Sequence, residues 1–181
     1  MLSDSITYTL TNLTARDKTV RILINRSELL HDISNMAYVE GDIMETEDDH
    51  QRHQVFDIIQ DGNIDRIERV LNKSYTEIEE ATYPYSKREV QHGTTLSDMH
   101  EGPRVYSLLL TLPKDFAEAT LDHMVHLIHE YMVCAALSDW MSITLPTAAD
   151  KWTMKKETAM DDLRRAVNFR IRRVRRTMSP F

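Results

Sequence analysis

LDHMVHLIHEYMVCAALSDWM, residues 121–141, is the stretch that decides the fold. Placed on a helical wheel at about 100° per residue, its apolar side chains gather within about 80° of Leu121. This group consists of Leu121, Met124, Val125, Ile128, Tyr131, Met132 and Ala135. The pattern predicts a long helix over 116–142 with one face in the protein core.

The segments around this helix show two further periodicities. Alternation of apolar and polar residues predicts strands near 5–12, 19–25 and 105–112, and helical spacing predicts helices over 26–39, 61–85 and 147–176. In the helix over 26–39, Met36 is expected in the apolar stripe, and the acidic segment 40–53 is expected to be a solvated loop. A long polar connection spans 86–104. We therefore expect a helix-dominant α+β fold with a small antiparallel sheet of about three strands, packed with a bundle of four or more helices.

Charge divides the chain into two regions. Residues 1–150 carry 12 lysines and arginines against 26 acids, whereas residues 151–181 carry 10 against 3. We accordingly expect an acidic α+β body over 1–146, followed by a basic C-terminal helix and tail over 147–181. Such asymmetry bears on the partners of a protein more than on its fold.

The remaining composition is that of a soluble domain. The chain has 181 residues, 41% of them hydrophobic, which is enough to bury one core. Its apolar runs are too short for a membrane span, and the segment MLSDSITYTL lacks the pattern of a signal peptide. The single cysteine, Cys134, cannot form an internal disulfide. These features predict a soluble protein that is synthesised in the cytoplasm, with no association with a membrane.

A histidine run, HMVHLIHEY over 123–131, is the most enzyme-like feature. His123, His126 and His129 recur every three residues, so their directions on a helix diverge by about 60° per step. A zinc-binding helix usually carries histidines four residues apart, as in H-E-x-x-H. We therefore expect a polar helix face here and no shared metal ion, although His50, His53, Asp49, His92 and His100 could supply further ligands.

Other sequence patterns of catalysis or ion binding fit poorly. The segment DGNID at 61–65 resembles the start of a calcium loop, but its glycine is second and position twelve is Asn72. Cys134 lies among apolar residues, as a small buried side chain would. Glycine-rich phosphate loops and the G-x-S-x-G motif are missing from the sequence. We expect neither an enzyme nor a cofactor.

The C-terminal stretch LRRAVNFRIRRVRRTMSPF, residues 163–181, is the most strongly charged part of the chain. Seven arginines fall between 164 and 176 with no acid among them, and arginine suits bidentate pairing with carboxylate or phosphate. The candidate partner-binding residues are Arg164, Arg165, Arg170, Arg172, Arg173, Arg175, Arg176 and the terminal Phe181. Nucleic acid is one possible target, and an acidic protein surface, including that of another copy, is the other.

Several stretches resemble small structural proteins of Bacteroidetes phages and prophages. They are DGNIDRIERVL (61–71), PYSK (84–87), LIHEYMVCAALSDWMSITLP (127–146), AADKW (148–152) and RRVRRTMSPF (172–181), about half of the chain. The resemblance is to head–tail connectors and adaptors, and it implies a virion protein in the neck that forms a homo-oligomeric ring between portal and tail proteins. It brings no catalytic residue with it.

The function expected from sequence is therefore that of a neck-ring subunit. An acidic ring wall would let DNA pass without sequence-specific binding, because phosphate contacts dominate nucleic-acid affinity. The first alternative is a nucleic-acid-binding accessory protein that uses the arginine-rich helix. The second is a metal-dependent enzyme that uses the histidine-rich helix.

Overall fold

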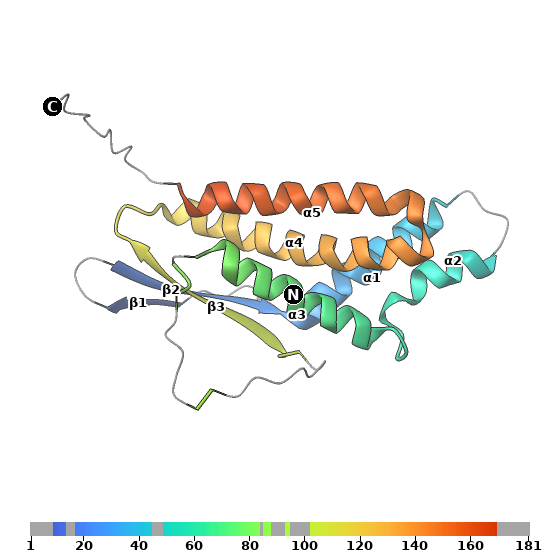
Figure 1. Ribbon diagram of the computed structural model, residues 1–181, viewed down its shortest axis with the longest axis horizontal. Helices are drawn as coiled ribbons and strands as arrows, with labels where there is room; N and C mark the ends of the chain where they lie inside the picture. The colour runs from blue at the N-terminus through green and yellow to red at the C-terminus, as the bar shows by residue number, and fades with distance from the viewer. Residues whose placement is uncertain are drawn as a thin grey trace, which may run out of the picture.

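The computed structural model describes residues 9–13, 17–44, 49–83, 85–87, 93–94 and 102–169. Its strands are β1 (Thr9–Leu13), β2 (Asp17–Asn25) and β3 (Val105–Pro113), and its α-helices are α1 (Arg26–Asp42), α2 (Asp49–Phe56), α3 (Ile64–Ala81), α4 (Glu118–Thr144) and α5 (Pro146–Val167). A short 3₁₀ turn, Asp57–Ile59, joins α2 to the segment before α3. The strands occupy one end of an elongated molecule, and α2 lies at the other (Figure 1).

The sheet is antiparallel, with the order β1-β2-β3. Paired residues of β2 and β3, such as Ile22 opposite Leu108 and Val20 opposite Leu110, are buried together. Because side chains alternate between the two faces of a strand, one face of this pair supplies the core and the other is more exposed. The helix-dominant α+β class is thus confirmed, and so is the pairing of the strand near 105–112 with the strand near 19–25.

The predicted count of about three strands needs a correction. The part of the sheet that supplies the core consists of the two nine-residue strands β2 and β3. The amino-terminal segment adds the five-residue β1 along the outer edge of β2, with Thr9 opposite Arg21. Residues 5–8, which the predicted first strand includes, lie outside the described residues.

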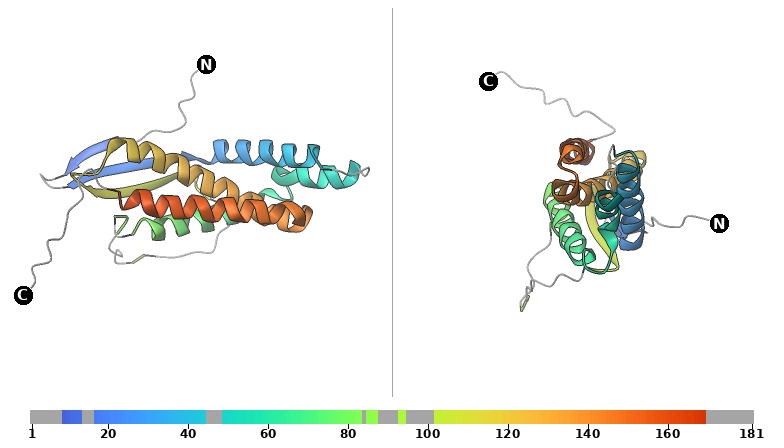
Figure 2. Two further views of the ribbon diagram at one scale, coloured as in Figure 1. Left: turned by 90° about the horizontal axis from the view of Figure 1, so that it is seen from above. Right: turned by 90° about the vertical axis from the view of Figure 1, so that its right-hand side faces the viewer.

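Helix α4 is the centre of the helical layer. It packs against α5 along most of its length and also contacts α1, α2 and α3. Viewed from above, α1 and α5 lie on either side of it (Figure 2). These neighbours bury every residue from 131 to 137, on all sides of the helix, whereas the helical wheel predicted that only one face would be buried. A helix that is covered on several sides can be apolar almost all round.

The start of α5 also follows from the sequence. Leu145 has a non-helical backbone, and Pro146 begins the helix at a position where the missing N–H costs no hydrogen bond. Trp152 and Leu163 of α5 are buried in the same core as α4. The break between the helices thus falls beside the expected boundary at 146/147, and α5 shares the core of the body. The described part of the chain contains no helix that combines the length and apolar composition needed to cross a bilayer.

Several predicted boundaries differ from the structure. The expected loop over 40–53 is wrong, because α1 continues to Asp42 and α2 begins at Asp49. Val55 and Ile58 are fully buried and hold this polar segment against the body. The helix predicted over 61–85 spans Ile64–Ala81, and the helix predicted to reach 176 ends at Val167, with residues from 170 onward outside the described range.

Candidate interaction surface at the end of α5

The last turn of α5 carries the two described members of the predicted arginine site. Arg165 Nη1 donates a hydrogen bond to Asp162 Oδ1 at 2.8 Å, and Arg164 Nη1 lies 3.4 Å from Asp161 Oδ1. All four side chains are largely or partly exposed, and exposed pairs one turn apart stabilise a protein little. Both guanidinium groups can therefore exchange these partners for carboxylates of another molecule at small cost.

The end of the helix fixes where these arginines lie. The backbone N–H of Asn168 donates to Arg165 O at 3.2 Å, and the Asn168 side-chain amide donates to Arg164 O at 2.8 Å. These bonds satisfy carbonyl groups that a helix end leaves without intrahelical partners. Positive side chains in the last turn also complement the negative end of the helix dipole. The sequence thus places an exposed basic turn at the point where α5 stops.

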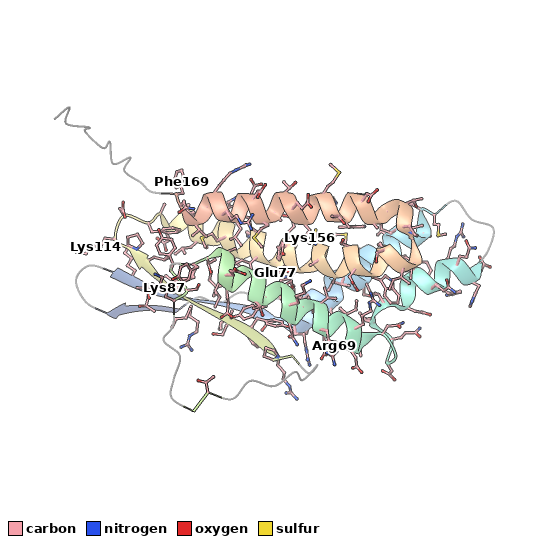
Figure 3. All side chains as sticks on the ribbon, viewed as in Figure 1. Arg69, Glu77, Lys87, Lys114, Lys156 and Phe169 are labelled. Atoms are coloured by element: carbon pink, nitrogen blue, oxygen red, sulfur yellow. The ribbon has the colours of Figure 1, made fainter. Side chains whose placement is uncertain are left out.

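Phe169 follows this turn and borders a shallow hollow. The hollow has a volume of about 440 Å³ and is lined by Ala119, Thr120, His123, Asp162, Arg165, Ala166 and Phe169. Phe169 is 57% exposed and lies at the end of α5, beside the sheet end of the molecule (Figure 3). An aromatic ring beside arginines is a frequent feature of protein interfaces. Sequence reasoning missed this hollow because it forms between the start of α4 and the end of α5.

The other members of the predicted site cannot be placed. Arg170, Arg172, Arg173, Arg175, Arg176 and Phe181 lie outside the described residues. In sequence they follow the exposed turn at Arg164 and Arg165. This turn lies at one end of the elongated body (Figure 1).

The three histidines of α4 do not converge. His123 lines the hollow near Phe169, whereas His126 and His129 line a different hollow, of about 220 Å³, between α4 and the start of α1. Among the described residues, no group of three or more histidine, cysteine or acidic side chains could hold a metal ion. His123 is thus set apart from the other two histidines, whereas His126 and His129 line the same hollow. The expected lack of a shared metal stays a prediction.

His129 instead forms a contact between two helices. Its Nε2 atom lies 2.8 Å from Asp32 Oδ2 of α1, and His31 Nδ1 lies 3.4 Å from Asp32 Oδ1. Asp32 is about half exposed, and Glu28 of α1 lines the same hollow. An imidazole N–H and a carboxylate oxygen at this distance form a hydrogen bond. This arrangement links α1 to α4 and gives a structural role to one of the three histidines.

Cys134 and Tyr131 are buried and poorly placed for catalysis. Burial raises the pKa of the Cys134 thiol to about 11, the charge of Glu130 raises it further, and Lys155 lowers it. Burial also raises the pKa of Tyr131, whose hydroxyl donates to Glu77, while nearby Arg164 lowers that pKa. A reactive cysteine needs a lowered thiol pKa and access to solvent. Cys134 is therefore a packing residue, as predicted.

An ion pair that sequence analysis did not anticipate links α1 to α5. Glu40 is buried, and its Oε1 atom pairs with Nζ of Lys151 near the start of α5. A buried carboxylate needs such a partner, because removing one member leaves an uncompensated charge. The pair fixes the end of α1 at the level of the start of α5. Separation by 111 residues leaves no local signal by which the sequence could have shown it.

Comparison with known proteins gives no family for this chain. It matches no protein-family model, and no curated protein and no solved structure is similar to it.

Proposed function

We propose that this protein is a structural subunit of a phage virion, a head–tail connector or adaptor that forms a ring in the neck. The observation that carries the proposal is the exposed basic turn at Arg164 and Arg165, from which the arginine-rich end of the chain continues. The virion setting rests on the sequence stretches quoted above for their resemblance to phage connector proteins, such as residues 61–71 and 127–146. The acidic composition of the rest of the chain supports a protein partner, since it opposes close approach to DNA.

In this proposal the arginine-rich end binds carboxylates of the portal or of a neighbouring subunit. Arginine forms paired hydrogen bonds with carboxylates, and its charge persists at any physiological pH. Phe181 adds an apolar anchor. The subunit is not an enzyme, needs no cofactor and lets DNA pass through the ring without sequence-specific contacts.

The test is a pull-down of purified protein on the portal protein of the same phage. Replacing Arg172, Arg173, Arg175 and Arg176 with glutamine should abolish binding. A matched control replaces four exposed cations elsewhere on the body, Lys18, Arg21, Lys87 and Lys114, with glutamine and should bind as the wild type does. Equal loss in the control and the test variant would show that net charge alone matters, and the proposed docking role would fail.

Nucleic-acid binding is the competing function, because the same arginines could contact phosphates. In that case the isolated protein would bind duplex DNA with an affinity that falls steeply with salt, by a slope of about 0.9 per phosphate contact. The four-arginine variant would flatten that slope. Such a result, together with failure to bind portal, would replace the connector proposal with the nucleic-acid one.

A further inference from the structure

The hollow between α4 and the start of α1 combines carboxylates with apolar surface. Its volume is about 220 Å³, and its lining consists of Ile24, Asn25, Glu28, Asp32, Val125, His126 and His129. Ile24 and Val125 are buried and so form its base, whereas Glu28 is exposed and Asp32 is about half exposed. This combination suits an arginine side chain, which has an apolar stem and a charged head that pairs with carboxylates.

The two carboxylates of this hollow have no lysine or arginine as a partner among the described residues. Asp32 contacts the imidazoles of His31 and His129, and neither ring carries the fixed positive charge of an arginine. Glu28 forms no ion pair within the described part of the chain. Arg26, the one basic residue of α1 apart from histidine, pairs with an acid of α3 instead. The hollow is therefore short of positive charge.

Helix α4 extends this acidic surface toward the end of α5. Over its whole length it contains four acids and no lysine or arginine. Asp122, His123 and His126 are exposed, and His123 lines the hollow beside Phe169 whereas His126 lines the hollow at α1. Three residues along a helix span about 5 Å, so the two hollows are neighbours on the surface of α4.

The arginine-rich segment follows directly from the first of these hollows. Phe169 comes just after the end of α5 and lines the hollow at the start of α4 (Figure 3). Residues 170–176 contain five arginines and no acid. Seven residues span up to about 23 Å, which is enough to cross α4 and reach Glu28 and Asp32. Because the segment is joined to the body, its effective concentration at the hollow is on the order of millimolar.

We infer that the segment over 170–176 docks on its own chain, with arginine side chains in the hollow between α1 and α4. Glu28 and Asp32 are four residues apart on one side of α1, so their side chains begin about 6 Å from each other and one guanidinium can contact both. The arginine stem then packs on Ile24 and Val125. This contact needs no other molecule and goes beyond the connector role, in which portal carboxylates would compete for the same arginines.

Trypsin tests this contact in the full-length protein, because it cleaves after arginine and a docked arginine is shielded from it. Glu28→Gln combined with Asp32→Asn removes both charges and keeps the shape of the side chains. Mass spectrometry should show cleavage after residues 170–176 about three- to tenfold faster in this double variant than in the wild type, since exposed ion pairs are individually weak. Glu28→Gln alone should accelerate cleavage less, and this exposed residue has no described ion pair whose loss could unfold the chain.

A matched control removes two acids at a distance from the hollow. Asp61→Asn combined with Asp150→Asn makes the same change in net charge, and both residues are exposed. Asp61 lies before the start of α3 and Asp150 lies near the start of α5, at the opposite end of that helix from Phe169. The control should be cleaved at the rate of the wild type, and circular dichroism should show all variants folded.

Three results would overturn the inference. Equal cleavage rates in the wild type and the double variant would show that the segment does not dock at Glu28 and Asp32. An equal acceleration in the control would show that net charge alone sets the rate. Protection that increases with protein concentration would show that the segment docks on another copy. A chain without protection could still bind portal in the pull-down, so the two proposals can fail independently.

Discussion

Tyr106 provides a test of the packing between β3 and α3. Its side chain is 1% exposed, and its hydroxyl donates a hydrogen bond to Asn72 Oδ1 at 2.8 Å. The ring also packs against Tyr75 of α3, with centroids 5.1 Å apart. Burial raises the pKa of Tyr106 to about 12 from its usual value of 10.0, while Arg26 lowers it and Glu68 raises it. Ionisation of this phenol is thus coupled to unfolding.

The sign of the effect follows from the raised pKa. Below pH 10 the phenol is neutral in both states and contributes its full stabilisation, whereas above pH 10 the unfolded chain loses its proton first and gains stability. A difference of two pKa units corresponds to about 2.7 kcal/mol once the pH exceeds 12, and to roughly 1.4 kcal/mol at pH 11. This stability is lost as the pH rises from 10 through 12.

The assay compares the wild type with Tyr106→Phe by urea unfolding at pH 9 and pH 11. At pH 9 the variant should be less stable by about 1 kcal/mol, because one buried hydrogen bond is missing. Between pH 9 and pH 11 the wild type should lose about 1.4 kcal/mol more than the variant, since other titrating groups are common to both. Equal losses in the two proteins would show that Tyr106 ionises freely in the folded state and would refute the buried placement of its hydroxyl.

Two further predictions concern residues away from the sheet. Gly41→Ala should lower the free energy of unfolding by roughly 1–3 kcal/mol, because a Cβ atom there would overlap the ring of Phe56. Gly62→Ala, where no heavy atom lies within 4 Å, is the control for thermal unfolding and should change stability much less. Cys134, whose thiol pKa is raised by burial to about 11, should resist a thiol reagent at pH 8 and react readily in urea. Rapid modification of the folded protein would contradict this burial.

The sequence predicts best where one periodicity holds along a whole element. The alternation near 105–112 and the helical spacing that begins at 147 both appear as predicted, because every second residue of β3 is buried from Tyr106 to Leu112 and α5 buries Trp152, Leu163 and Val167. Prediction is weaker in α1, where Met36 fits the stripe by spacing and yet is exposed. Spacing alone cannot tell a side chain that a neighbour covers from one that no neighbour reaches.

Helix α2 shows a second reason for error. Its residues are mostly polar, and Val55 is the one residue of this helix that the structure describes as buried. Short helices in water are marginal, so α2 depends on tertiary contacts such as the hydrogen bond from Trp140 Nε1 to Val55 O at 3.1 Å. That contact joins residues 85 positions apart, and the polar composition of 40–53 gives no sign of it.

The candidate site also has one part that the sequence predicts and another part that depends on tertiary packing. Composition alone identified Arg164 and Arg165 as exposed cations, because a solvated face needs no neighbour to specify it. The hollow beside Phe169 depends on how α4 and α5 pack, and so it could not be predicted. Surface charge can be read from a sequence more directly than surface shape.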